Sequence, residues 1–120
     1  MAGTANISSS FVVTFNPSDT LETVITNPGR TFRVVGVAIT NTTGGARNVK
    51  VEKDGTSNVT NGGDYSAADN TTSWADLDTA NVEFTSGNNL HITCADAGVE
   101  VYVFCVATEG GATMSTATAP

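Results

Sequence analysis

The sequence predicts an all-β protein, an antiparallel two-sheet sandwich of jelly-roll type with about eight strands, and three observations lead to this prediction. Thr, Ser, Asn and Gly are abundant, whereas Lys and Glu, which usually cover helix surfaces, are scarce. Short segments of alternating apolar residues recur, with turn residues between them about every eight to twelve positions. No segment carries a helical apolar stripe longer than a turn or two. An immunoglobulin-like sandwich is the alternative.

The length of 120 residues favours one domain with flexible ends. We expect an N-terminal arm at residues 1–10, a β-sandwich domain at residues 11–108 and a C-terminal tail at residues 109–120. The arm and the tail consist mostly of small polar residues, which bury too little apolar surface to offset the entropy lost on ordering. By themselves, both ends are therefore expected to be disordered.

The first half of the domain predicts two outer strands and one central strand. A strand at residues 11–15 ends at the Asn16-Pro17 turn, and a second strand follows at residues 21–26. Residues 32–40 are apolar at nearly every position, which is typical of a strand covered on both faces. Gly36 interrupts this strand, so we expect a bulge there or a bulky neighbour above it.

The middle of the chain predicts a hairpin followed by a long loop. Residues 47–53 alternate valine with polar residues, and Asp54-Gly55 favours a type I′ turn because both positions tolerate positive φ. A short return strand is expected at residues 57–60. Residues 61–73 show no periodicity and predict a loop, before strand alternation resumes at residues 80–84.

Residues 88–108 form the most regular stretch and predict a closing β-hairpin whose loop is residues 95–98. In the register that pairs Cys94 with Val99, Cys105 lies about 20 Å from Cys94 along the hairpin. This separation is too large for a disulfide, which needs Cα atoms within about 7 Å. We therefore expect two free, buried thiols and no zinc site.

The second arm of this hairpin has an unusually apolar outward face. Tyr102, Phe104 and Val106 alternate there with the valines that face the core. Such a face is too apolar for a solvated edge. Other segments of the chain cover it, or a neighbouring molecule does. We predict an intersubunit or partner contact at Phe104.

The charge distribution argues against nucleic-acid binding and leaves one question open. The net charge is −7, and phosphate binding requires clustered Lys and Arg, of which there are only five. Residues 1–53 carry all five cations and three carboxylates, a net +2, whereas residues 54–120 carry nine carboxylates and no cation, a net −9. This split reflects chance and solubility, or it steers a head-to-tail assembly in which a basic strand meets acidic loops of a neighbour.

The start of the chain predicts neither export nor membrane insertion. Met1 is followed by neither a basic segment nor an apolar run, and no apolar stretch approaches the length that spans a membrane. We expect synthesis in a cytoplasm.

The sequence contains no combination of residues that is typical of a catalytic site. His91 is the single histidine, and its strand position between Leu90 and Ile92 points it away from the core, so a solvated or interface position is favoured over catalysis. An acidic cluster resembles the oxygen ligands of a calcium loop but lacks the Asp-x-Asp-x-Asp-Gly frame; it comprises Asp64, Asp69, Asp76 and Asp78. We therefore predict no enzyme, no cofactor and no metal site.

Tyr65 and Trp74 are the aromatic residues of the middle segment, and two roles are open for them. They can form an aromatic platform for a sugar ring. A position in the core or at an interface is favoured for Trp74, because a single Trp in a small sandwich usually covers one end of the core.

Two segments and the flexible ends resemble a family of virion proteins. The segments are Phe-Arg-Val-Val-Gly-Val-Ala-Ile-Thr-Asn-Thr-Thr-Gly (32–44) and Val-Glu-Phe-Thr-Ser-Gly-Asn-Asn-Leu-His-Ile-Thr (82–93). In style, and over most of its length, the chain resembles the small, acidic, Thr- and Gly-rich all-β structural proteins of tailed bacteriophages. Head decoration (cement) proteins are the nearest type, followed by small fibre modules. The resemblance includes no diagnostic motif, so no residue role is carried over.

This resemblance implies a virion protein without catalysis that sits on the capsid surface and stabilises it. It would bind the major capsid protein and its own copies, with a trimer favoured, through the arm, the tail and exposed strand faces. The expected partner-binding residues are Tyr102, Phe104, Val106, Arg47, Lys50, Tyr65 and Trp74. The alternative is a glycan-binding fibre or adhesin module for host attachment that uses Tyr65, Trp74 and the Asp-rich segment.

Overall fold

The computed structural model describes residues 3–7, 10–16, 23–27, 29–94, 96, 98–108 and 112–116. The strands are β1 (Gly3–Ile7), β2 (Ser10–Phe15), β3 (Thr23–Ile25), β4 (Phe32–Asn41), β5 (Arg47–Lys53), β6 (Ser57–Asn58), β7 (Tyr65–Ala67), β8 (Thr71–Trp74), β9 (Glu83–Phe84), β10 (Leu90–Cys94), β11 (Val99–Ala107) and β12 (Ala112–Thr116). The expected turn after Asn16, the start of the expected strand 21–26, and most of the tail fall on residues outside these ranges.

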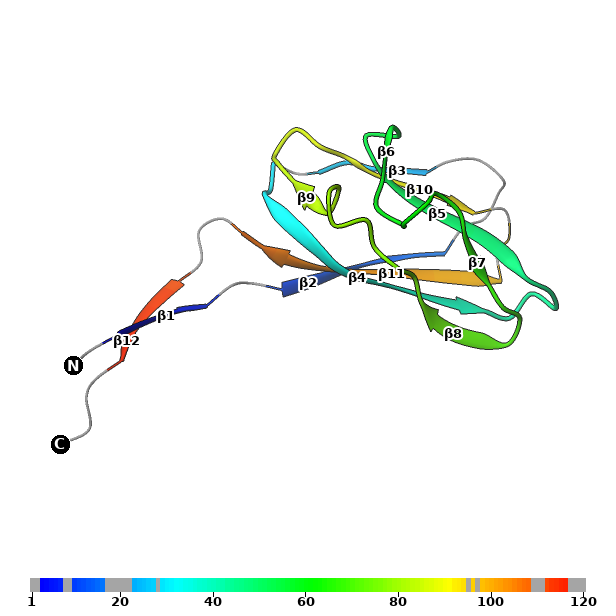
Figure 1. Cartoon of the computed structure of the whole chain (residues 1–120), viewed down its shortest axis with the longest axis horizontal. Coiled ribbons are helices and arrows are strands. Elements are labelled where there is room, and N and C mark those ends of the chain that lie inside the picture. The colour runs from blue at the N-terminus through cyan, green and yellow to red at the C-terminus, as the bar shows by residue number, and fades with distance from the viewer. Residues whose placement is uncertain are drawn as a thin grey trace.

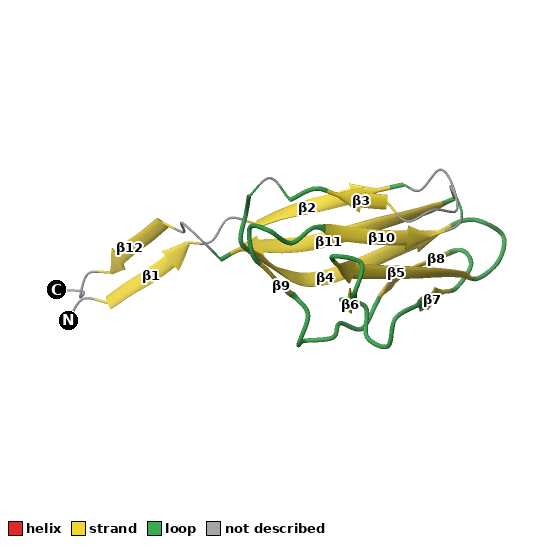
Figure 2. Ribbon diagram, turned by 90° about the horizontal axis from the view of Figure 1, so that it is seen from above, coloured by secondary structure: helices red, strands yellow, loops and turns green. Residues whose placement is uncertain are grey.

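Two antiparallel sheets of five strands each pack face to face, which confirms the predicted sandwich; Figure 1 shows the two layers from the side and Figure 2 from above. The β4 sheet has the order β2-β11-β4-β8, and β9 also pairs with β4. The β5 sheet has the order β3-β10-β5-β6, and β7 also pairs with β5. The core between them consists of valine, isoleucine, leucine and phenylalanine side chains from both sheets.

The chain winds as a jelly roll, in which strands of the first half lie beside counterparts from the second half. β2 pairs with β11, β3 with β10, β4 with β8 and β9, and β5 with β6 and β7. Consecutive strands cross from one sheet to the other from β2 to β5. Eight strand positions result when β6 with β7, and β8 with β9, are each taken as one interrupted strand.

The predicted hairpin of residues 88–108 is wrong, because β10 and β11 lie in different sheets (Figure 1). Cys94 pairs with Val49 of β5, and Val99 pairs with Asn41 of β4. The inward residues were nevertheless predicted correctly, since the apolar alternate positions of both strands are buried. Alternating apolar residues show which face of a strand is buried. The alternation is the same whether the next strand pairs with this strand or crosses to the opposite sheet, so it does not reveal the pairing partner.

The predicted free, buried thiols are confirmed. Cys94 and Cys105 are both buried and unbonded to each other. The Cys105 Sγ contacts the Val103 carbonyl at 3.6 Å, and burial raises the pKa of the Cys105 thiol to about 12. Cys105 therefore stays protonated in the folded protein.

We expect both thiols to resist Ellman's reagent in the native protein and to react fully after denaturation, because the thiolate is the nucleophile and neither sulfur is accessible. The measurement is the time course of absorbance with and without guanidinium. A Thr72→Cys variant, whose position on β8 is exposed, serves as the control and should react at once. Fast native labelling of the unaltered chain would show that the sandwich opens at these strands.

The segment 61–73 is not the unstructured loop that was expected. It contains β7, which pairs with β5, and most of β8, which pairs with β4, so this segment crosses from one sheet to the other. Asn70 makes the turn between them with a φ of 55°. These strands escaped prediction because they are short and mostly polar, so no apolar alternation marks them.

Two local predictions are confirmed. Asp54 and Gly55 have φ values of 56° and 70°, and the Thr56 N–H donates to the Lys53 carbonyl at 3.2 Å, as in a type I′ turn. The segment expected to be central is β4, which lies between β11 on one side and β8 and β9 on the other.

The two ends of the chain form a ribbon instead of remaining unpaired. β1 and β12 pair antiparallel, with Gly3 opposite Thr116 and Ile7 opposite Ala112. Figure 1 shows this terminal ribbon projecting from one end of the sandwich, and the molecule measures 60 × 30 × 23 Å. Neither terminal segment shows an apolar periodicity by itself. Because β2 and β11 are paired, however, the segment before β2 and the segment after β11 leave the sandwich side by side.

Candidate interaction site

The outward side of the β4 sheet carries an exposed group of large apolar residues, here called the outer apolar face. Trp74 is 62% exposed, Val35 52% and Val12 47%, which makes them the largest exposed apolar side chains of this sheet in the described part of the chain. Phe104 lies half-buried among them, opposite Val12 of β2 and Gly36 of β4. The face therefore spans four neighbouring strands, β2, β11, β4 and β8.

Gly36 lies beneath the aromatic side chains of the outer apolar face. A Cβ atom at Gly36 would lie 2.8 Å from Cζ3 of Trp74, so the absence of a side chain lets the indole ring approach the strand at this position. The Trp74 and Phe104 ring centroids are 5.3 Å apart with their planes tilted by 37°. The strand register shifts between Phe104 and Cys105, and Val35 is the extra residue of this bulge. Both expectations for Gly36, a bulge and a bulky neighbour, are confirmed.

Polar groups border the outer apolar face. The Tyr102 hydroxyl donates to the Glu100 carboxylate, and this hydrogen bond raises the pKa of Tyr102. On the next strands the Thr40 and Thr72 hydroxyls are hydrogen-bonded at 3.0 Å. An apolar centre with a polar border is the usual composition of a protein interface.

The predicted partner-binding residues do not all come together. Tyr102, Phe104 and Val106 lie half-buried on the outward side of β11, as expected for that strand, and Trp74 joins them from β8. Tyr65 belongs to β7 in the other sheet and packs against the core. The platform of Tyr65 and Trp74 is therefore not formed. Alternation in residues 99–106 revealed the first three residues, but only tertiary contact revealed that Trp74 lies beside Phe104.

The cations of the first half of the chain largely meet carboxylates of the same chain. Arg47 Nε lies 3.0 Å from Asp96 Oδ2, and Lys50 Nζ lies 3.6 Å from Glu52 Oε1. Arg33 pairs with Glu83. The pKa of Asp96 is lowered by a hydrogen bond from the Gly98 N–H and by Arg47. Part of the charge split is thus neutralised within the molecule, which leaves less charge to attract a neighbour.

Two carboxylates of the acidic cluster are hydrogen-bonded to the backbone, and the histidine lies within a sheet. Asp69 Oδ1 accepts a hydrogen bond from the Gly44 N–H at 2.8 Å, and Asp78 Oδ1 accepts one from the Ala80 N–H at 3.0 Å. His91 lies half-buried in β10, opposite Val24 and Glu52. Among the residues that the structure describes, no group of three or more His, Cys, Asp or Glu side chains could hold a metal ion.

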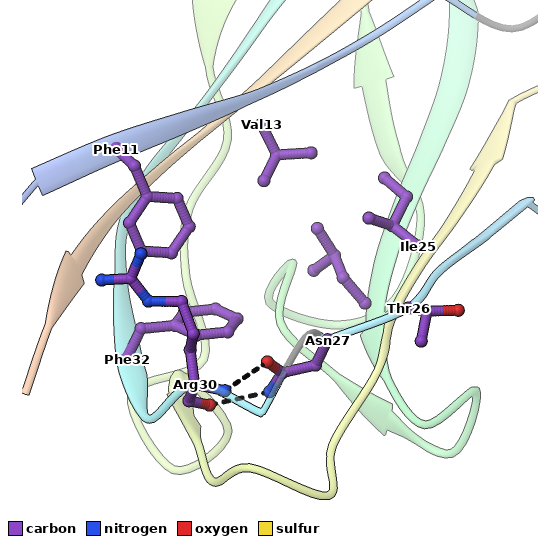
Figure 3. A pocket seen from close by; sticks show the side chains of 8 residues that line it. Phe11, Val13, Ile25, Thr26, Asn27, Arg30 and Phe32 are labelled. Carbon is purple, nitrogen blue, oxygen red and sulfur yellow. Dashed lines mark hydrogen bonds between the residues drawn. The ribbon is translucent and has the colours of Figure 1, made fainter. Parts of the chain in front are cut away.

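A second feature is an apolar cavity of about 290 Å³ between β2 and β3, the edge strands of the two sheets, here called the seam pocket (Figure 3). Its lining is Phe11, Val13, Ile25, Thr26, Asn27, Arg30, Phe32 and Leu90. The Arg30 guanidinium lies 5.1 Å from the centre of the Phe11 ring, a cation–π contact between two of the lining residues. Nothing in the sequence pattern indicated this pocket, because it arises where two sheets fail to close.

The chain matches no protein-family model, no curated protein and no solved structure. Among the described residues there is no helix of the length and apolar character needed to cross a membrane.

Proposed function

We propose that this chain is a non-enzymatic structural protein of a tailed-phage virion, which decorates and stabilises the capsid by binding the major capsid protein and its own copies. The observation that carries the proposal is the outer apolar face, where Trp74 is 62% exposed and contacts Phe104, which lies opposite Val12. The virion context comes from the resemblance of the sequence to decoration proteins.

The shape and composition of this face favour a large protein partner. Soluble monomers rarely expose contiguous apolar patches larger than a few hundred Å², and such patches usually mark binding surfaces. Trp and Tyr are enriched among the residues that dominate binding energy at the centres of protein interfaces. Because the outer apolar face lies on a hydrogen-bonded sheet, its side chains lose little conformational freedom when a partner covers them.

We expect Trp74→Ala to weaken binding to capsids that lack this protein by about tenfold or more, since the most exposed aromatic side chain of the face is removed. The measurement is occupancy per capsid after co-sedimentation over a range of protein concentrations. The thermal midpoint of the variant should be measured alongside, to separate lost binding from lost folding.

A matched pair of valines on the two sheets provides the control. Val12 is 47% exposed on the β4 sheet and Val24 is 50% exposed on the β5 sheet. Val12→Ser should reduce occupancy, whereas Val24→Ser should leave it unchanged. Equal occupancy for Trp74→Ala, Val12→Ser and the unaltered protein would refute binding through the outer apolar face.

The exposed indole also favours a second candidate, a glycan-binding fibre or adhesin module, because sugar rings stack on exposed aromatic side chains. Specific signals on a glycan array that disappear in Trp74→Ala, together with no binding to capsids, would support this candidate over capsid decoration.

A further inference from the structure

The terminal ribbon is a two-stranded sheet of its own, and its strands are neighbours in the chain of β2 and β11. Ser10 of β2 pairs with Val106 of β11, and Ile7 of β1 pairs with Ala112 of β12, so β1 comes directly before β2 in the chain and β12 directly after β11. Within the described residues, β2 pairs only with β11 and β1 pairs only with β12. In the described part of the chain, the second edges of β1 and β2 therefore have no partner strand, and we call these two edges together the N-terminal edge.

The N-terminal edge lacks the features by which proteins protect exposed strand edges. Natural edges carry charged side chains, prolines or bulges, or they are very short. Residues 3–15 contain no charged residue and no proline, and β2 alone extends over six residues. A row of unpaired N–H and C=O groups on such a strand readily accepts another strand.

The seam pocket lies along this edge. Phe11 and Val13 of β2 line the pocket, whereas Val12 between them is on the outer side of the sheet. A strand added to β2 would therefore place alternate residues over the pocket and over the outer side.

The residues of β1 suit this position in one register. If Ile7 of an incoming β1 lies opposite Phe11, then Ala5 lies opposite Val13, and Asn6 lies opposite Val12. The larger apolar residue types of β1 then fall over the apolar pocket, and a polar one falls on the outer side. Neither strand carries a charge whose desolvation would oppose pairing.

We propose that two copies of this chain pair antiparallel along their N-terminal edges about a two-fold axis, so that β1 of each copy adds to β2 of the other and covers its seam pocket. A single edge can pair with itself in this way, because the two-fold operation places the β1 of either copy beside the β2 of the other. This pairing deepens the self-association named in the proposed function, requires no capsid, and gives a dimer where the resemblance favoured a trimer.

The pairing also accounts for the projecting ribbon. An isolated two-stranded ribbon is marginally stable in water, and three or more strands or packing against another layer are needed for independent stability. Pairing places β1 between β12 of its own chain and β2 of the partner. The same contact then stabilises the ribbon and covers the pocket.

We expect the unaltered protein to sediment as a dimer, and Ile7→Asp to raise the dimer dissociation constant at least about tenfold, because a charge would be placed over an apolar pocket. Asn6→Asp introduces the same charge one residue away, on the outer side, and should change the constant less than about threefold. Sedimentation equilibrium measures both. A monomer or a trimer in the unaltered protein, or equal effects of the two variants, would overturn the proposal.

Cross-linking tests the register without disturbing the pocket. Asn6→Cys combined with Val12→Cys should give a covalent dimer on mild oxidation, whereas Thr4→Cys with Val12→Cys, two residues out of register, should give much less. The native thiols are buried and do not compete. Equal yields from both double variants would refute the register. A monomeric protein whose seam pocket binds decanoate, with binding lost in Arg30→Ala, would assign the pocket to a small amphipathic anion and overturn the pairing.

Discussion

Replacing Phe84 by Ala will lower the free energy of unfolding by about 3–5 kcal/mol, the usual cost of deleting a buried phenylalanine ring. Phe84 is fully buried, and its ring stacks on Phe32 with centroids 4.7 Å apart and planes 11° from parallel. Phe84 lies on β9, which has only two residues, so few backbone hydrogen bonds hold this strand in the sheet once the ring is removed. A single domain is typically stable by about 5–15 kcal/mol, so this one change removes a large fraction of the total.

Urea denaturation followed by circular dichroism measures this effect. Val35→Ala is the control, because Val35 is 52% exposed on the bulge of β4 and should change the free energy of unfolding by less than about 0.5 kcal/mol. A similar midpoint shift in both variants would show that the ring of Phe84 does not hold the two sheets together.

Asn41→Ala is expected to cost about 3 kcal/mol, because it leaves buried polar groups without partners. Asn41 is fully buried at the end of β4, and its Nδ2 donates to the carbonyls of Gly45 and Ala67, both at 2.9 Å. Its Oδ1 accepts from the Thr43 N–H at 3.0 Å and from the Thr43 hydroxyl at 2.8 Å. One side chain thus connects β4, the following turn and β7.

Denaturation monitored by fluorescence measures the loss, and hydrogen exchange of the Thr43 amide reports it locally. Asn48→Ala removes the same side chain from an exposed position of β5 and should be nearly neutral. Unchanged protection of the Thr43 amide in Asn41→Ala would contradict the role assigned to this side chain.

The candidate site was only partly predictable from the sequence. The outward positions Tyr102, Phe104 and Val106 follow from alternation along a single strand, and their apolar character was visible at once. The proximity of Trp74 to Phe104 was not, because their strands are separated in the sheet by β4 and meet only across Gly36. The seam pocket depends on the gap between the edges of two sheets, which no local pattern encodes.

The sequence by itself determined the all-β class, the residues that face the core, the Asp54-Gly55 turn and the two buried thiols. These features depend on the pleat of one strand or on the backbone preferences of one or two residues. The tertiary structure alone decided the pairing partners, placing β10 and β11 in opposite sheets and joining the two ends of the chain as β1 and β12. Pairing is a long-range choice: each buried strand offers the same inward side chains to any partner, and the winding of the jelly roll selects among them.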